Sequence, residues 1–312
     1  MTGHDAVTVV VVNWNAGQRL RECVKSVLRH APGVVPRLVV VDNLSTDGSA
    51  DKLESVPGVT LVRAGENLGF GRACNLGARG VDSAYLLFLN PDAALDVGTL
   101  PSLLAFMDEP ANARVGICGV QLRDEERRVA RSCSRFPTSG RLLARAVGLD
   151  RLFPSLGCAM SEWAHDATRD VDQVIGAFFL VRRELFEALQ GFDERFFVYY
   201  EEVDFSLRAH RAGWRSVYFA GAQAFHAGRG TTEQIKARRL FYYLRSRVLY
   251  SFKHFAWPAA FAVLLVTLLV EPVARSFAAL GQRSWSGVRE TGAAFALLWD
   301  WLPRWIIRGE RA

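Results

Sequence analysis

A run of six residues near the N-terminus, Val7 to Val12, consists only of β-branched side chains and ends at Asn13. A half-buried strand alternates apolar and polar residues, whereas a continuous run of this kind is typical of a strand buried on both faces. Such strands belong to parallel sheets that helices cover on both sides. The run therefore predicts an α/β protein.

Further strands and helices follow in alternation. Leu20, Val24 and Val27 have the spacing of an amphipathic helix over residues 18–30. The next expected strands are Leu38–Val41, Val59–Arg63 and Tyr85–Leu89. This order predicts a doubly wound, Rossmann-like sheet, mostly parallel and flanked by helices. Ligands of such sheets bind beyond the carboxyl ends of the strands, where Asn13, Asp42 and Asp92 fall.

The second part of the chain is less regular. Residues 123–172 are polar and rich in Arg, so we expect an insertion or a flexible loop over the site. A strand over Val174–Arg182, with Gly176 and Ala177 inside it, and a helix over 183–190 come next. A late strand, Trp214–Phe219, is expected to lead into a loop that carries His226.

An acidic and aromatic run spans residues 191–204. It holds five carboxylates, namely Asp193, Glu194, Glu201, Glu202 and Asp204. Apolar neighbours imply burial, and a buried carboxylate has a raised proton affinity, which suits a general base. The alternative is a helix start with acids placed on its N-terminal dipole.

Charge divides the chain into two predicted domains, 1–230 and 231–312. The first holds 26 Lys and Arg against 27 Asp and Glu, and the second holds 12 against 5. The second part is also rich in Trp and apolar residues, which favours an anionic membrane surface and argues against nucleic acid as a partner.

The apolar run Phe255–Val270 lies in this C-terminal part, after a basic helix over 234–253. It is shorter than the roughly 20 residues that a membrane span needs, and Glu271 and Pro272 interrupt it. Crossing therefore requires that the helix continue through Ala274. An interfacial hairpin, or an amphipathic pair packed on the α/β domain, remains open, and residues 293–308 have an interfacial Trp and Arg composition.

Two short motifs and the cysteines carry less information. Asn67 to Cys74 contains Gly69-Phe70-Gly71 but lacks the third glycine of a dinucleotide fingerprint. Asp92 follows a buried strand and could reach a divalent cation that bridges two phosphates, although Asn90-Pro91-Asp92 also suits a plain turn. The five cysteines show no paired spacing, which predicts a reducing, cytosolic environment.

Taken together, these motifs resemble the family 2 inverting glycosyltransferases of the GT-A fold, in particular their rhamnosyltransferase-like bacterial branch. The resemblance covers roughly residues 7–250, and its specificity comes from the order and spacing of the motifs. The residues that carry it are Val9 to Asn15, Val40 to Ser49, Asn67 to Gly71 with Asn75 to Gly77, Leu89 to Asp92, the acidic run, Gly213-Trp214 and His226.

The resemblance implies roles for individual residues. The nucleotide-sugar donor would bind along Asn13, Asn15, Asp42, Asn67, Gly69, Asn75 and Asn90. Asp92 and His226 would hold Mg²⁺ or Mn²⁺. Gly176, Ala177 and Asp193 would border the acceptor. Glu202 falls at the position of the catalytic base, although this family usually has Asp there, which leaves Glu201 as the alternative.

The resulting hypothesis is an inverting, metal-dependent glycosyltransferase in cell-surface or cell-wall polysaccharide synthesis. The donor implied by the resemblance is dTDP-rhamnose, and the acceptor is a glycan or a polyprenyl-diphosphate-linked sugar. Arg245 and Arg247 are candidates to meet the lipid-linked diphosphate. The C-terminal helices would attach the chain, peripherally or by a hairpin, to the cytoplasmic face of the membrane.

Two other functions and one assembly state stay open. A nucleotidyltransferase can use a similar sheet, although the loop after Val12 lacks the basic, Gly-rich pattern expected for it. An inactive glycan-binding protein of the same fold is compatible with Asn90 and Glu202. The sequence leaves a homo-oligomer open.

Overall fold

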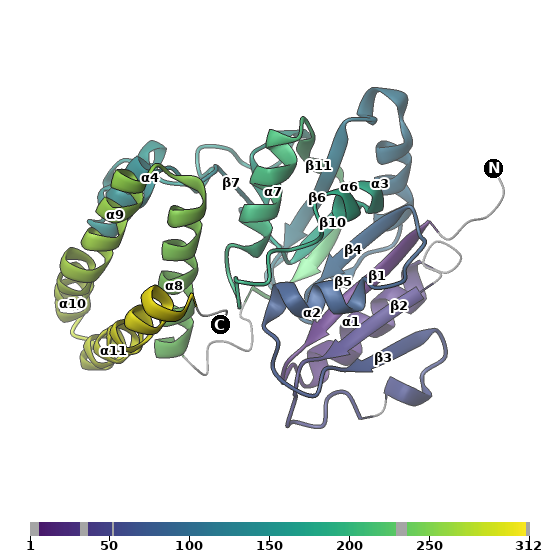
Figure 1. The fold of residues 1–312 in the computed structure, drawn as a ribbon. Coiled ribbons are helices and arrows are strands. Elements are labelled where there is room, and N and C mark those ends of the chain that lie inside the picture. The colour runs from purple at the N-terminus through teal and green to yellow at the C-terminus, as the bar shows by residue number, and fades with distance from the viewer. Residues whose placement is uncertain (1–5, 32–36, 52, 229–235, 310–312) are drawn as a thin grey trace. The chain divides into compact units, whose positions relative to one another are not determined.

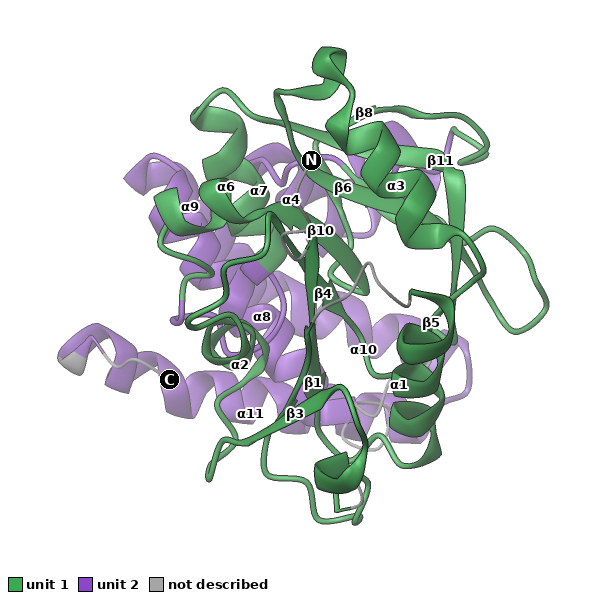
Figure 2. Ribbon diagram, turned by 90° about the vertical axis from the view of Figure 1, so that its right-hand side faces the viewer, with its two compact units in different colours: residues 1–134, 163–193, 202–231 green, residues 135–162, 194–201, 232–312 purple. Residues whose placement is uncertain are grey.

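The computed structural model describes residues 6–31, 37–51, 53–228 and 236–309. They form two compact units (Figure 2). We call residues 1–134, 163–193 and 202–231 the sheet unit, and residues 135–162, 194–201 and 232–312 the helical unit. This division differs from a single cut near residue 230, because two earlier segments group with the C-terminal helices. The expected cut itself, between residues 230 and 231, lies outside the described residues.

The sheet unit is built on a nine-stranded sheet in the order β3-β2-β1-β4-β10-β6-β11-β5, with β8 paired to β11 (Figure 1). A separate small sheet pairs β7 (Cys133–Ser134) with β9 (Gln173–Val174). The strands of the large sheet are β1 (Val7–Asn13), β2 (Arg37–Asp42), β3 (Val59–Arg63), β4 (Tyr85–Leu89), β5 (Ala93–Leu95), β6 (Val115–Arg123), β8 (Arg169–Val171), β10 (Phe178–Arg182) and β11 (Arg215–His226).

Strand β1 is buried at every residue and pairs in parallel with β2 and β4, which confirms the prediction from its β-branched run. Successive side chains of a strand point to opposite faces. Val9 and Val11 join a core with α1 (Gln18–His30) and α3 (Thr99–Asp108). On the other face, Val10 meets α2 (Phe70–Gly77), where a Cβ on Gly77 would lie 2.5 Å from Val10 Cγ1.

A cluster of phenylalanine side chains packs on the same face of the sheet as α2. Ring centroids of Phe88 on β4 and Phe192 lie 5.0 Å apart, and Phe192 and Phe205 lie 5.3 Å apart. Phe186 of α6 (Arg183–Ala188) and Phe205 of α7 (Glu201–Arg211) bring these helices onto this face. Helices therefore cover both faces, as the continuous apolar strands predict.

The second half of the sheet is mixed. Strand β10 runs antiparallel to both β4 and β6, while β6 and β11 are parallel. Strand β6 was not predicted, and β11 continues to His226, which pairs with Ala93. Gly176 and Ala177 precede β10 and do not lie within it, contrary to the expectation.

The expectation of an irregular segment over residues 123–172 is wrong for its middle part. That part holds α4 (Ser139–Ala146), α5 (Leu149–Leu152) and the short helix η3 (Pro154–Leu156). Thr138 caps α4 by accepting a hydrogen bond from the Arg141 N–H at 3.2 Å. These helices belong to the helical unit.

The C-terminal helices are α8 (Lys236–His254), α9 (Trp257–Leu265), the π-helical segment η5 (Val266–Val270), α10 (Glu271–Gly281) and α11 (Trp285–Arg308) (Figure 1). Their core joins Leu244 and Val248 of α8 with Leu264, Leu268 and Leu298. The helical run does continue past Pro272. Residues Trp257–Gly281 form the one described helix that is long and apolar enough to cross a membrane.

Candidate active site

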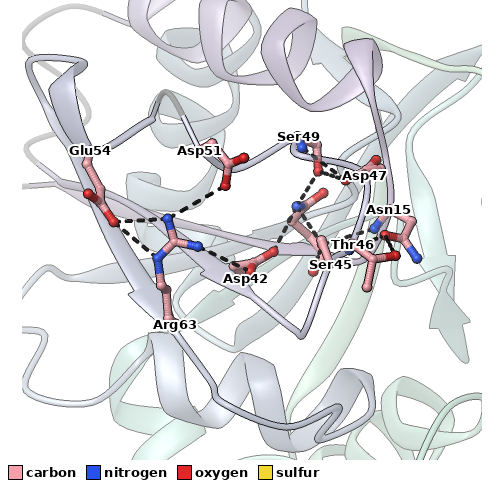
Figure 3. Close-up of polar contacts among 10 residues, drawn as sticks. Asn15, Asp42, Ser45, Thr46, Asp47, Ser49, Asp51, Glu54 and Arg63 are labelled. Carbon is pink, nitrogen blue, oxygen red and sulfur yellow. Dashed lines mark hydrogen bonds and ion pairs between the residues drawn. The ribbon is translucent and has the colours of Figure 1, made fainter.

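The carboxyl ends of β1 and β2 hold the first group of site residues (Figure 3). Asn13 and Asp42 end the two strands in register. The fully buried Asn13 donates hydrogen bonds from Nδ2 to Asp42 Oδ1 at 3.1 Å, Ser45 Oγ at 2.9 Å and Ser49 Oγ at 2.8 Å. Asn13 thus fixes the orientation of Asp42 and of the following turn.

The turn over residues 45–49 closes one side of this group. Asn15 has φ 52° and its Oδ1 accepts a hydrogen bond from the Thr46 N–H at 2.7 Å. Asp47 accepts from the Gly17 N–H at 2.8 Å and from Ser49 Oγ at 2.6 Å. Partial burial acts against ionisation of Asp47, but the hydrogen bonds from Ser49 and Gly17 prevail and lower its pKa.

Arg63, at the end of β3, is a site residue that the sequence analysis missed. Its guanidinium lies 3.9 Å from Asp42 Oδ2, 3.1 Å from Glu54 Oε1 and 3.9 Å from Asp51 Oδ1 (Figure 3). The only available signal was its place at the last position of a predicted strand. Arg63 therefore places a positive charge beside the carboxylate of Asp42 at this end of the sheet.

Asn43 is a second missed residue, and it joins the strand end to the Gly69 turn. Asn43 Nδ2 donates to Asn67 Oδ1 at 3.0 Å and to the Gly69 carbonyl at 3.2 Å, and its Oδ1 accepts from the Leu68 N–H at 2.8 Å. Gly69 has φ 77°, which favours glycine, and it precedes α2. Asn67 and Gly69 are therefore held against the end of β2, as expected of residues that share a site.

Asp92 and His226 come together from distant parts of the sequence. His226 Nε2 lies 3.4 Å from Asp92 Oδ1, and Arg19 Nη1 lies 4.0 Å from Oδ2. The Ala227 N–H donates to the Asp92 carbonyl at 3.1 Å. Asp92 is buried, and its Oδ2 has no hydrogen-bond partner among the described residues.

This pair fits a divalent cation as a partial ligand set. Carboxylate oxygen and imidazole nitrogen are suitable ligands for Mn²⁺, and Mg²⁺ takes one or two carboxylates together with substrate phosphate oxygens. Within the described part of the chain no group of three or more His, Cys, Asp and Glu could hold a metal. If a cation binds here, Asp92 and His226 would supply two ligands from the described residues, and further ligands would come from substrate or water.

Asn90 and Ala177 connect the metal candidates to the segment before β10. The Asn90 N–H donates to the Ala177 carbonyl at 3.0 Å, and Cys23 Sγ contacts the Asn90 carbonyl at 3.5 Å. Burial, with the nearby Asp92 charge, raises the pKa of the Cys23 thiol. Cys23 is therefore a neutral, structural residue at this turn.

Glu202 lies against Gly176. Backbone N–H groups of Gly176, Val203 and Glu202 itself donate to its carboxylate, yet burial has the larger effect and raises the pKa of Glu202. Oε2 lacks a hydrogen-bond partner within the described residues. A Cβ on Gly176 would lie 3.7 Å from Phe70 Cε1 and 3.9 Å from Glu202 Cδ, so Phe70, which was not predicted, also lies beside Gly176.

Glu201 precedes Glu202 at the start of α7, and it is buried. Adjacent residues of a helix point about 100° apart, so the two carboxylates do not share one environment. The contact with the Gly176 N–H belongs to Glu202. Asp193, the third acidic candidate, is half-buried just after Phe192.

Asn75 has a different task from the one expected of it. Its Nδ2 donates to the Phe192 carbonyl at 2.8 Å, and its Oδ1 accepts from the Phe192 N–H at 2.9 Å. Gly191 is required beside it, because a Cβ there would lie 2.5 Å from Asn75 Oδ1. The amide is engaged by backbone, so Asn75 positions the start of the acidic run, and its contact with the donor stays a prediction.

The expectation for Arg247 is wrong, and that for Arg245 is not supported. Arg247 is buried within the helical unit, where it forms an ion pair with Glu271 and donates to Thr267 Oγ1 at 2.8 Å. Arg245 is also buried, with its guanidinium 5.5 Å from the Trp301 ring, and burial lowers its pKa to about 10. A side chain in either place does not face a lipid head group.

The family is settled by comparison with known proteins. The family model described as glycosyl transferase family 2 matches residues 8–190. This chain belongs to glycosyl transferase family 2. The matched span contains every donor-side and metal candidate except His226.

Known relatives of this family 2 glycosyltransferase include rhamnosyltransferases. It is 30% identical over 270 residues to N-acetylglucosaminyl-diphospho-decaprenol L-rhamnosyltransferase of Mycobacterium tuberculosis, covering 81% of this chain and 86% of that protein. It is 27% identical over 191 residues to rhamnosyltransferase WbbL of Escherichia coli, covering 58% of this chain and 69% of the relative.

Solved structures show that this family 2 glycosyltransferase has the GT-A fold. The mannosyltransferase PcManGT of Pyrobaculum calidifontis, in complex with GDP-Man and Mn²⁺, matches with a TM-score of 0.54 at 21% identity, over 95% of this chain and 81% of that one. GalNAc-T7 with UDP, GalNAc and Mn²⁺ matches with a TM-score of 0.53 at 17% identity, over 71% and 43%. These likenesses confirm the predicted fold class.

Proposed function

We propose that this chain is an inverting rhamnosyltransferase that transfers rhamnose from dTDP-rhamnose to a hydroxyl of a polyprenyl-diphosphate-linked sugar, at the cytoplasmic face of the membrane. The observation that carries the proposal is Glu202. It is a buried carboxylate with a raised pKa that accepts from the Gly176 N–H, and its Oε2 has no hydrogen-bond partner among the described residues. The Mycobacterium tuberculosis relative supports the choice of sugar and acceptor.

The donor would lie along the ends of β1, β2 and β4. Asp42, oriented by Asn13 and flanked by Arg63, would bind the nucleoside, since a carboxylate suits hydroxyl and N–H donors. Asn15, Asn67 and Asn90 are further donor-side candidates, and Gly69 permits the backbone to approach closely.

Asp92 and His226 would hold Mg²⁺ or Mn²⁺. Asp92 Oδ2, which has no hydrogen-bond partner among the described residues, and the neighbouring imidazole suit such a cation, which would offset the charge that develops on the leaving diphosphate. In the bond-forming step, the acceptor hydroxyl oxygen attacks the anomeric carbon while the bond to the diphosphate oxygen breaks.

Glu202 takes the hydroxyl proton in that step. The attack comes from the face opposite the leaving group, so one displacement inverts the anomeric configuration without a covalent intermediate. Its raised pKa makes Glu202 a stronger base than an exposed carboxylate. Because the general base and the metal candidates are all present, a transferase is favoured over an inactive glycan-binding protein. Gly176 and Ala177, and Asp193 after them, remain acceptor-side candidates.

The test is a transfer assay with purified chain in detergent, a short-chain polyprenyl-diphosphate GlcNAc acceptor and Mn²⁺. We expect product from dTDP-rhamnose but not from UDP- or GDP-sugars, with NMR showing inversion at the anomeric carbon. Retention would contradict the mechanism, transfer from another donor alone would overturn the sugar assignment, and failure with every donor would support the inactive alternative.

Metal dependence has a matched pair of variants in the same assay. Asp92→Asn keeps the size of the side chain but removes its charge, so Mn²⁺-dependent donor binding measured by calorimetry should be lost with most turnover. Asp124→Asn, on an exposed turn where Asp124 pairs with Arg128, should leave both unchanged. Equal Mn²⁺ dependence in the two variants would remove Asp92 from the metal site.

A further inference from the structure

The outward face of the continuous helix formed by α9, η5 and α10 is apolar along its whole length. Side chains there are widely exposed, with 68% for Trp257, 59% for Leu269 and 70% for Phe277. Between Trp257 and Leu280, which the structure describes in full, the most exposed residues are all apolar, and Arg275, whose side chain is 35% exposed, is paired with Glu271. We call this face the apolar stripe; its members are Trp257, Pro258, Phe261, Leu265, Leu269, Val270, Val273, Phe277 and Leu280.

Most members of the apolar stripe are spaced four residues apart, so they lie on one side of the helix. The other side is already used: Ala260, Val263 and Leu264 are buried, and Leu264 belongs to the core with α8 and α11. A helix on the surface of a soluble protein carries charged residues on its outer face. The stripe therefore needs an apolar partner outside the chain.

Length alone would allow this helix to cross a bilayer, because it has 25 residues. Its middle argues otherwise. Glu271 lies near the midpoint, is buried, and pairs with Arg247 of α8 and with Arg275. Crossing would put this cluster at the centre of the hydrocarbon and would bring α8, which also carries exposed Arg238 and Arg239, alongside it. Lying flat, the helix turns the stripe toward lipid and keeps Glu271 buried in the helical unit.

The apolar surface extends beyond the helix. Val266 lines a groove of about 710 Å³ with Leu143 of α4, Val147 just after α4, Leu149 of α5 and Leu156 of η3. Leu152 and Phe153, next to these residues, are 73% and 57% exposed. A surface made of a long stripe and an adjoining irregular groove suits a fluid partner better than a rigid protein face.

We propose that the helical unit binds an anionic lipid bilayer through the apolar stripe, with the helix of α9 and α10 lying in the plane of the membrane interface and not crossing it. The excess of basic residues in 231–312 provides the charge complementarity, and Arg283 and Arg289 are exposed there. The inference deepens the proposed function. It rests on that function in one respect only, namely that a lipid-linked acceptor requires the chain to work at a membrane.

The first test is flotation of the full chain with vesicles of phosphatidylglycerol and phosphatidylcholine. The double variant Phe261→Glu with Phe277→Glu places two charges on the stripe and should weaken binding more than tenfold. Val97→Glu is the matched control, because Val97 is 84% exposed in the sheet unit, and it should bind like the wild type. Binding of the stripe variant at the wild-type level would overturn the proposal.

The second test decides between lying flat and crossing. Ala256→Cys and Gln282→Cys place thiols at exposed positions just outside the two ends of the helix. When chain is added to preformed vesicles, a membrane-impermeant maleimide should label both positions. Protection of one end from the outside, relieved by opening the vesicles, would show a crossing helix and overturn the proposal.

Failure here is distinguishable from failure of the proposed function. If the chain transfers rhamnose in detergent and the stripe variant still binds vesicles normally, this inference alone is wrong. If the wild-type chain binds vesicles through the stripe but transfers no sugar, the inference stands and the proposed function fails.

Discussion

The two units place polar and apolar side chains in opposite ways. In the sheet unit, apolar strands are covered on both faces, and buried polar groups collect at strand ends, such as Asn13, Asp42 and Asp92. In the helical unit, an ion pair between Arg247 and Glu271 lies inside and an apolar stripe lies outside. The helical unit thus buries one charged pair and exposes an apolar surface.

The difference shows that a buried charged residue does not by itself mark a functional site. Asp92 and Glu202 each retain an oxygen without a hydrogen-bond partner in the described structure, beside other candidates at the sheet edge. Arg247 is buried to a similar degree, but its charge is balanced by Glu271 within a helix core. What separates Arg247 from Asp92 is how closely the opposite charge approaches: Arg247 donates a hydrogen bond to Glu271, whereas Arg19 Nη1 lies 4.0 Å from Asp92 Oδ2.

The largest effect that tests this comparison is expected at Arg247. Arg247→Met would leave Glu271 buried with only Arg275 as its partner. Breaking a buried pair from one side costs about 3–5 kcal/mol, and we expect the lower end of that range because Arg275 remains. The measurement is urea unfolding, followed by tryptophan fluorescence, since Trp301 and Trp305 lie in or against the helix core.

The exposed pair Arg304 and Asp300 on α11 is the matched control. Arg304→Met should change the free energy of unfolding by less than about 0.5 kcal/mol, because exposed pairs contribute little. The double variant Arg247→Met with Glu271→Leu should recover much of the loss. Similar losses for Arg247→Met and Arg304→Met would mean that the buried pair does not hold the helical unit together.

A smaller effect is expected at Asn75. Asn75→Ala removes two hydrogen bonds to the Phe192 backbone and should lower the free energy of unfolding by about 1–3 kcal/mol. KM for the donor should stay close to the wild-type value, because the amide is engaged by backbone. A large rise in donor KM with unchanged stability would restore Asn75 to the donor site and contradict the positioning role.

Much of the sheet unit could be predicted from sequence, for a physical reason. Strands buried on both faces, such as β1 and β4, have continuous apolar runs, and the polar residue that ends each run marks the site edge. The pairing of Asp92 with His226 was expected from family resemblance and agrees with their 3.4 Å separation.

The helical unit could be predicted only in part, because the contacts of its residues are made with partners far away in the sequence. Nothing local in the sequence indicates that Arg247 pairs with Glu271, or that α4 and α5 group with the C-terminal helices. Asn75 and Asn43 were similarly ambiguous, since an amide that binds backbone and one that binds ligand look alike in a sequence. Strand β6 was missed although its residues are buried.

The most direct test of the central claim is the pH dependence of kcat/KM for transfer by wild type, Glu202→Gln and Glu201→Gln. Because burial raises the pKa of Glu202, the base is lost at a higher pH than for an ordinary glutamate, and wild-type activity should fall as the pH is lowered through that pKa. Glu202→Gln should lower turnover roughly 10²–10⁴-fold and should no longer show this fall in activity at low pH, while its affinity for the donor is unchanged. Glu201→Gln should still show the fall in activity at low pH. If Glu202→Gln retains it and Glu201→Gln loses it, Glu202 is not the base.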